Sequence, residues 1–567
     1  MNRTFKIVVF FLISILVFCF VFRNEIIERI VLVVINHQLN ESEDRVYDVV
    51  CGKVEVELIA GNISLVDIQV SPRVDSNFIL KKKMNEFPFL VKGKLNRVTI
   101  KEFSWSAYWE HEELQVEEVI VVNPLVKLLL GDFKEEISDL ESVEYTEAIT
   151  QLFSSVKIEK VIIENCSVEV AKAFTPEKLL IDLDSLSFYF DHIAMDTVKS
   201  KRNPYWFFEN LEFNMKSIKA SLGGGYRMEA KNLSISASEN SLSLEDIKVT
   251  PVHSKDKDSI KGESENYFTL FTSKIDFLGV NYKEIVRAGN IAIDKIDVAD
   301  PKFQYLIDLV HIKEEQEATF LPTTLFRGIK TNISVGSLEV KNGEVELLMK
   351  TDHRNKPVSL YFDKVNGVTN KLSVGTDWYS SGVMETNIEA VFQKEAKLDL
   401  NLILPMYMTN DEFFIKGTLG EMSLKGLNPV VEATSFVTLS SGVIHQVDLE
   451  FIADNKAAEG RLLMDYSNLS LIFLKELTPS NSGRRRKYHI VDTYLGNNFI
   501  KRANNPKALF FREGYINVKR EQTLNFWSYL WGSIETGVTH SLIKTSRKKK
   551  RKVKKYKKYR LSRVIYN

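Results

Sequence analysis

The stretch Lys397-Leu398-Asp399-Leu400-Asn401-Leu402-Ile403-Leu404 places four leucines at alternate positions, with polar side chains between the first three. A period of two residues is typical of a β-strand with one apolar face, because a helix would distribute the same leucines around its axis. Further short apolar segments follow, separated by turn-forming Gly, Asn, Ser and Asp: Phe413 to Leu419, Ser435 to Leu439, Val443 to Ile452 and Gly460 to Met464. The pattern predicts a run of antiparallel strands with one polar, solvent-exposed face and one apolar face.

The same alternation occurs along most of the chain, beginning at Val54, Val56 and Leu58. A recurring phrase ends an apolar alternation with proline, and its copies are Asp67 to Pro72, Glu118 to Pro124, Asp246 to Pro251 and Lys295 to Pro301. The first and second prolines, and likewise the third and fourth, are about 50 residues apart, so the phrase predicts an elongated array with a long insertion in the middle. Each proline is expected to end its strand, because proline has no N–H for the ladder.

Two segments interrupt the strands. The apolar spacing in Phe133 to Phe153 predicts a helix, with Asp132 as N-cap, that packs over an open side of the sheet. Leu321-Pro322-Thr323-Thr324 predicts the start of a short helix.

The N-terminus predicts a membrane anchor. Ile7 to Phe22 is a continuous apolar run without a charge, preceded by Arg3 and Lys6 and followed by Arg23. The run is a little shorter than a bilayer core of about 30 Å requires, but the flanking basic side chains extend it by snorkelling. No small-residue cleavage site follows, which favours a retained signal anchor with a cytoplasmic N-terminus, and a buried core helix is the alternative. Ile26 to Leu39 is expected to continue as a helix along the membrane.

The C-terminal stretch Gln522 to Thr545 predicts an amphipathic helix. Phe526, Leu530, Ile534, Val538 and Leu542 recur at every fourth position, beside Trp527, Tyr529 and Trp531. This ridge fits equally well a membrane interface, with Phe526, Trp527, Leu530 and Trp531 as the contacting residues, or a plug over the end of an exposed β-groove.

The charge is distributed unevenly. Lys plus Arg and Asp plus Glu both number 75, but 12 basic and no acidic residues follow Ser546, which leaves a net charge of −12 before the tail. The tail includes Lys548, Lys549, Lys550, Arg551 and Lys552. Anionic lipid headgroups are its expected partner, whereas nucleic acid is not expected, because the anchor places the body across the membrane.

No catalytic constellation, cofactor motif or metal site is found, so the sequence predicts a protein that is not an enzyme and has no cofactor. Gly223-Gly224-Gly225 lacks the lysine of a phosphate loop and predicts a hairpin turn. His111, with Glu110, Glu112 and Glu113, predicts a solvated acidic loop rather than a metal site. Of the three cysteines, Cys19 lies in the apolar run, and Cys51 with Cys166 could form a disulfide outside the cytosol or remain buried thiols.

The anchor, the repetitive β body and the C-terminal helix together resemble the AsmA-like family, which includes TamB-related proteins. The resemblance is carried by the proline phrases, by Leu321-Pro322 leading into Ile333 to Gly343, and by Phe413 to Leu471. It implies a mainly β fold in which an elongated, repetitive antiparallel sheet curls into a groove, a β-taco, anchored in the inner membrane with its body in the periplasm. Such proteins look like bacterial relatives of the bridge-like lipid-transfer proteins.

The predicted organisation is therefore a signal-anchor helix and following amphipathic segment over 1–40, a β-groove body over 41–510 with a helical insertion near 133–154, a C-terminal amphipathic helix over 511–546 and a basic tail over 547–567. The expected function is to bind and transfer or shield phospholipid between membranes. The alternative is a structural or assembly factor of the outer membrane or cell envelope that contacts envelope proteins. Candidate groove residues are Ile291, Ile293, Ile296, Val298, Leu398, Leu400, Leu402 and Leu404.

Overall fold

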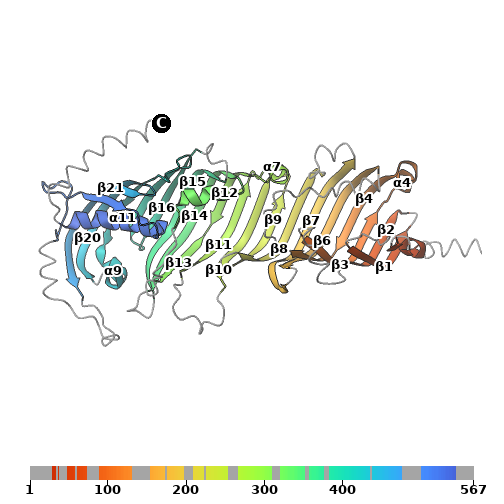
Figure 1. Cartoon of the computed structure of the whole chain (residues 1–567), viewed down its shortest axis with the longest axis horizontal. Helices are drawn as coiled ribbons and strands as arrows, with labels where there is room; N and C mark the ends of the chain where they lie inside the picture. The colour runs from red at the N-terminus through yellow and green to blue at the C-terminus, as the bar shows by residue number, and fades with distance from the viewer. Residues whose placement is uncertain are drawn as a thin grey trace, which may run out of the picture. The chain divides into compact units, whose positions relative to one another are not determined.

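The computed structural model is mainly β (Figure 1). It divides into two compact units, Met1–Val252 and His253–Asn567. It describes residues 28–33, 36–37, 47–57, 60–72, 89–130, 154–172, 175–196, 208–222, 225–252, 266–308, 319–350, 357–375, 382–434, 437–474 and 500–543. Within these ranges no helix has the length and apolar content needed to cross a bilayer. The run Ile7 to Phe22, the helix predicted near 133–154, most of the Gly223 to Gly225 turn and the basic tail lie outside them.

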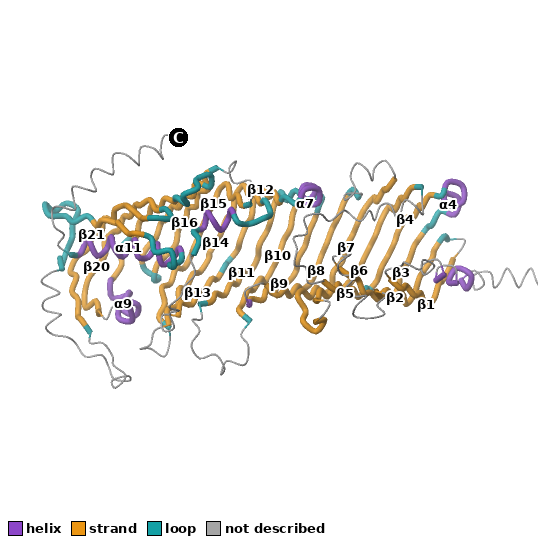
Figure 2. Tube along the Cα trace, viewed as in Figure 1, coloured by secondary structure: helices purple, strands orange, loops and turns teal. Residues whose placement is uncertain are grey.

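The first unit is a sheet whose strands pair largely in chain order. Its elements are β1 (Tyr47–Glu57), β2 (Asn62–Pro72), β3 (Phe89–Lys101), α4 (Trp105–His111), β4 (Glu113–Val122), β5 (Leu125–Leu130), β6 (Ser155–Lys172), β7 (Thr175–Asp196), β8 (Asn210–Leu222), β9 (Tyr226–Ser236) and β10 (Ser241–Pro251). Residues 28–33 and 36–37 are helical, within the segment Ile26 to Leu39 for which a helix is expected. Figure 2 shows these strands lying side by side, one after another.

The second unit continues with strands of the same kind and more helices. Its elements are β11 (Tyr267–Leu278), α7 (Tyr282–Ala288), β12 (Ile291–Ala299), β13 (Lys302–Asp308), α8 (Pro322–Arg327), β14 (Ile333–Lys350), β15 (Val358–Val374), β16 (Val383–Phe392), β17 (Ala396–Pro405), β18 (Phe413–Leu419), β19 (Met422–Ser423), η2 (Leu424–Leu427), α9 (Asn428–Thr434), β20 (Val437–Ala453), β21 (Ala457–Phe473), β22 (Gly514–Lys519) and α11 (Phe526–Leu542). Helices α8 and α11 lie where the sequence predicts a helix after Leu321 and after Gln522.

The predicted antiparallel sheet is instead mixed. Most pairs are antiparallel, but β4 and β5 run parallel to β6, and β12 and β13 run parallel to β14. A parallel neighbour requires the chain to cross back to its starting edge before the next strand begins. This return follows β5 in the first unit and β13 in the second, where α8 forms part of it. An alternating pattern predicts a strand but does not reveal its direction.

Bulges interrupt the strands at residues in the left-handed backbone region. Asp67, Asn123, Asn165, Asp246, Asp300 and Asn342 all have φ between 47° and 54°. Asn and Asp tolerate this conformation better than most residues. An extra residue in one strand bends it and shifts the phase of the alternation. Two segments predicted as separate strands, those that end at Leu439 and at Ile452, likewise belong to one strand, β20 (Val437–Ala453).

The recurring prolines occupy two different positions. Pro72 and Pro251 are the last residues of β2 and β10, as predicted. Pro124 and Pro301 instead lie between two strands that share the same neighbours, and their carbonyl oxygens accept hydrogen bonds from Ser167 N at 2.9 Å and Glu344 N at 2.7 Å. β4 ends at Val122 and β12 ends at Ala299, so these two strands also end just before the proline, as predicted, and the chain continues as β5 and β13.

The chain contains an internal duplication. Strands β1 to β7 and β9 to β15 follow the same order, and their starting residues differ by a nearly constant offset, as Tyr47 and Tyr226 or Ser155 and Ile333 illustrate. Helices α4 and α7 occupy equivalent places. The partners in the two parallel ladders are equally far apart in sequence, as Glu113 with Ser155 and Ile291 with Ile333 show. Each pair of neighbouring proline phrases therefore lies within one copy, and the copy is a much longer repeat than the sequence predicts.

Candidate functional site

An apolar face extends across the sheet of the first unit. Cross-strand registers place apolar side chains opposite one another from β2 to β10, in the row Leu65, Val98, Val121, Ile163, Phe188, Phe213, Ile235 and Leu242. A second row runs beside it: Ile63, Ile100, Val119, Val161, Phe190 and Leu211. Because adjacent strands lie about 4.8 Å apart, each row places one apolar side chain about every 4.8 Å across the sheet.

Bulges keep these side chains on one face. In β6, Ile163 and Cys166 are separated by an odd number of positions and would point to opposite faces of a regular strand. Asn165, with φ of 51°, lies between them and resets the alternation. Both side chains consequently belong to one apolar cluster with Leu186, Met215 and Phe188.

The opposite face of the same strands is mostly polar and carries cross-strand ion pairs. Arg97 contacts Glu55 at 2.8 Å, Lys101 contacts Glu118 at 2.5 Å and Lys127 contacts Glu169 at 3.1 Å, measured from nitrogen to oxygen. Hydrogen bonds from Arg97 and Lys53 lower the pKa of Glu55 to about 2. The registers therefore separate a polar from an apolar face, as the alternation predicts.

The apolar face of the first unit is incompletely covered within the described residues. In its central cluster Cys166, Leu186 and Met215 are buried, while Val168, Phe188, Phe213 and the other surrounding members are only partly buried. Residues 28–33 cover one end, where Val31 and Leu32 pack against β1 and β2. The sheet therefore fixes the positions of these apolar side chains, while part of their surface stays exposed.

The predicted groove residues of the second unit also lie opposite apolar partners. Ile291, Ile293, Ile296 and Val298 of β12 pair with Ile333, Val335, Leu338 and Val340 of β14. Leu398, Leu400 and Leu404 of β17 pair with Ala390, Ile388 and Met384 of β16, and Leu402 pairs with Thr386. Ile293 and Leu404 are buried, whereas the others are half-buried.

The same kind of face is covered at the C-terminal end of the second unit. Leu404, Phe413, Phe451 and Leu462 belong to a large buried cluster to which α11 contributes Tyr529. Phe413 lies against Phe526 and Tyr529, with ring centroids 5.4 Å and 6.3 Å away. Helix α9 forms a second cover, with Val430 and Ala433 packed against Val358 and Leu360 of β15.

A row of small side chains brings α11 close to the sheet. The buried residues of this helix recur at every fourth position: Tyr529, followed by the small residues Ser533, Gly537 and Ser541. A Cβ on Gly514 of β22 would collide with the carbonyl oxygen of Gly537, and one on Gly537 would lie 2.9 Å from Cβ of Leu462. The ridge of Phe526, Leu530, Ile534, Val538 and Leu542 is partly buried beside this row. The sequence analysis missed the small residues because it sought apolar periodicity, although their regular spacing was visible.

An ionic network holds α8 beside this core. Arg327 Nη2 lies 2.5 Å from Asp411 Oδ1, and the hydroxyls of Thr323 and Thr324 each donate to Asp411 at 2.7 Å. Burial of Asp411 without these partners would be costly, because an isolated carboxylate loses its hydration. The network therefore fixes the connection that leads into β14.

The two predicted uses of α11 correspond to two of its faces. Phe526 and Leu530 pack against the buried cluster, which agrees with a cover over the sheet. Trp527 and Trp531 are 55 % and 52 % exposed, so a membrane contact by these two residues stays a prediction.

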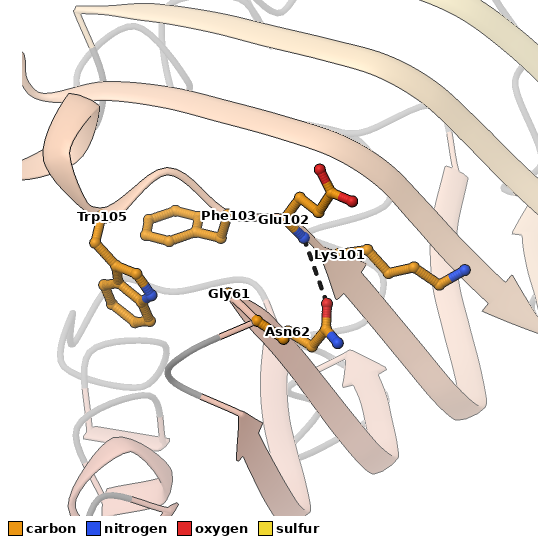
Figure 3. A pocket seen from close by; sticks show the side chains of 7 residues that line it. Gly61, Asn62, Lys101, Glu102, Phe103 and Trp105 are labelled. Atoms are coloured by element: carbon orange, nitrogen blue, oxygen red, sulfur yellow. Dashed lines mark hydrogen bonds between the residues drawn. The ribbon is translucent and has the colours of Figure 1, made fainter.

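A shallow hollow of about 540 Å³ lies beside α4, lined by Ala60, Gly61, Asn62, Lys101, Glu102, Phe103 and Trp105. Figure 3 shows the Phe103 and Trp105 rings next to each other, while the Lys101 side chain extends away from them. The dashed line marks the bond that Glu102 N donates to Asn62 Oδ1 at 3.4 Å. The hollow is separate from the apolar rows and was not anticipated from the sequence.

The remaining sequence candidates carry no site chemistry. In the part of the chain that the structure describes, no group of His, Cys, Asp and Glu could hold a metal ion. His111, predicted to lie in a loop, is instead the last residue of α4 and is exposed. Lys548 to Lys552 lie outside the described residues.

The two described cysteines, Cys51 and Cys166, are buried free thiols. They lie on β1 and β6, about four strand spacings or roughly 19 Å apart, which is too far for a disulfide. Of the two alternatives that the sequence leaves open, the structure therefore favours buried thiols.

No protein-family model matches the chain, and no curated protein sequence is significantly similar to it.

Proposed function

We propose that the protein is an envelope protein that carries or shields phospholipid on the apolar face of its sheets. The observation that carries the proposal is the row of partly buried apolar side chains from β2 to β10, backed by a mostly polar opposite face. Acyl chains on this face gain about 0.8 kcal/mol per buried CH₂, close to what a bilayer interior offers. A lipid can therefore enter and leave without a deep free-energy trap.

In this proposal the apolar rows line a groove in the first unit, and the candidate groove residues of β12 and β17 line a groove in the second unit. Ile7 to Phe22 anchors the chain in the inner membrane with the body in the periplasm, as the resemblance to AsmA-like proteins implies. The basic tail binds anionic lipid surfaces, and no enzymatic chemistry is involved.

The test is lipid occupancy of the purified full-length protein, measured by extraction and mass spectrometry. Ile163 pairs with Phe188 on the apolar face, whereas its neighbour Ile162 pairs with Tyr189 on the opposite face. Ile163→Asp is expected to reduce bound phospholipid at least several-fold, and the matched control Ile162→Asp to leave it unchanged. Absence of phospholipid from the wild-type protein would contradict the proposal and favour an assembly factor that contacts envelope proteins.

A further inference from the structure

Helix α4 presents an aromatic surface with no counterpart in the second copy. Phe103 lies 4.7 Å from Trp105 and 6.0 Å from Tyr108, and Tyr108 lies 5.3 Å from Trp109, measured between ring centroids. Trp109 is 75 % exposed, an unusual position for the largest apolar side chain. The sheet therefore holds this cluster in a fixed arrangement while leaving its outermost ring in solvent.

The equivalent helix α7 has the same length and is capped in the same way at both ends. Side chains of Ser104 and Asn281 cap the two helices, and Glu112 and Gly289 end them in the left-handed conformation. In sequence, α7 reads Tyr-Lys-Glu-Ile-Val-Arg-Ala where α4 reads Trp-Ser-Ala-Tyr-Trp-Glu-His. The tryptophans are therefore not required to form a helix at this place in the fold.

A chain of contacts places α4 beside the point where the N-terminal segment arrives. Glu28 Oε1 accepts a hydrogen bond from Val56 N at 3.1 Å, next to the turn between β1 and β2. In that turn, Gly61 O accepts a bond from Phe103 N at 2.9 Å, and Phe103 is part of the aromatic cluster. The stretch from Phe22, the end of the apolar run, to Glu28 spans about 9 Å as a helix and about 20 Å when extended.

We propose that the surface formed by Phe103, Trp105, Tyr108 and Trp109 docks into the headgroup region of the bilayer that holds the N-terminal segment. Tryptophan and tyrosine favour this region because their rings combine apolar area with a polar group. The inference rests on the anchor of the proposed function, but not on lipid carriage by the sheet. Docking at a second point would fix the orientation of the first unit relative to the membrane, which a single tether cannot do.

The charges around α4 specify the kind of membrane contact. Glu102, Glu110 and Glu112 are exposed beside the aromatic rings, so an anionic surface would repel them. The contact therefore depends on ring insertion rather than on charge. It should form on zwitterionic phosphatidylcholine and change little with salt, in contrast to binding through the basic tail.

Matched labels test this docking in the full-length protein. Ser106 and Lys283 are exposed residues at equivalent positions of α4 and α7, so each is replaced by Cys in a Cys19→Ser background and labelled with nitrobenzoxadiazole. The native Cys51 and Cys166 are buried and are expected to stay unlabelled. The proteins are reconstituted into phosphatidylcholine vesicles that contain spin-labelled phosphatidylcholine as a quencher.

Docking predicts strong quenching of the label at position 106 and little at position 283. Trp109→Glu should abolish the quenching at position 106, whereas Trp109→Phe should retain most of it, with the anchor intact in both variants. Equal quenching at the two positions, no quenching at position 106, or quenching that survives Trp109→Glu would each overturn the proposal. Because bound phospholipid is measured separately, these outcomes are distinguishable from failure of lipid carriage.

Discussion

The apolar face of β2 to β10 and the apolar face of β17 to β22 arise from the same alternating pattern, but they are covered differently. In the second region α11 lies on the sheet, and Phe413, Phe451 and Leu462 are at most 2 % exposed. In the first region Phe188 and Phe213 remain partly exposed, although their rings lie 4.7 Å apart. The strands alone therefore produce an apolar surface, and the helices determine whether it becomes a buried core or stays partly exposed.

The largest expected effect follows from removing a ring in the covered region. Phe413→Ala should lower the free energy of unfolding by about 4 kcal/mol, because the surrounding rings cannot fill the cavity. Phe188→Ala should cost about 1 kcal/mol but reduce bound lipid, since its ring is already partly exposed. Urea unfolding of both variants checks the difference, and equal costs would remove the contrast between the two regions.

Breaking the ionic network beside the cover should have the next largest effect. Asp411→Ala leaves Arg327, whose side chain is 13 % exposed, without its anionic partner, and should cost about 3 kcal/mol. The comparison is Glu169→Ala, which removes the exposed pair with Lys127 and should cost less than about 1 kcal/mol. Thermal unfolding measures both variants, and similar losses would show that the network does not hold α8.

A smaller effect is expected from replacing the glycines of α11, the helix that covers the second region. A methyl group at Gly537 would contact Leu462, so Gly537→Ala should destabilise the protein by about 2 kcal/mol. Gly532 lies on the same helix with no atom near its added Cβ, and Gly532→Ala should stabilise by up to about 1 kcal/mol. Opposite signs in chemical unfolding are expected, and a loss of stability in both variants would contradict close packing through one face.

The smallest effect concerns the polar face of the open sheet. The pKa of Glu55 is about 2, below the value of about 4.3 for an unfolded glutamate, so its stabilisation is present above about pH 4.3. This stabilisation is lost as the pH falls towards 2. Because the side chain is 35 % exposed, Glu55→Gln should cost less than about 1 kcal/mol near neutral pH, and this cost should disappear as the pH falls through 2. A cost that persists at the lower pH would indicate a different cause.

The sequence predicted strands well where alternation is regular, as in β17 and β18, because each residue's face follows from its position. It failed where a residue such as Asn165 or Asn342 shifts the phase, since nothing local shows whether an Asn is a turn or a bulge. The parallel pairs and the internal duplication depend on register between distant strands, which periodicity does not contain. The candidate leucines of β17 were found because they alternate, whereas the row of β2 to β10 emerges only once the strands are aligned.

The most direct test of lipid binding on the open face is photocrosslinking from single sites carrying a benzoyl side chain. The sites are Phe188 on the apolar face, its neighbour Tyr189 on the opposite face and Phe451 in the covered core. The account predicts phospholipid adducts from position 188 and none from positions 189 and 451. Absence of adducts at 188, or equal adducts at 188 and 189, would contradict it.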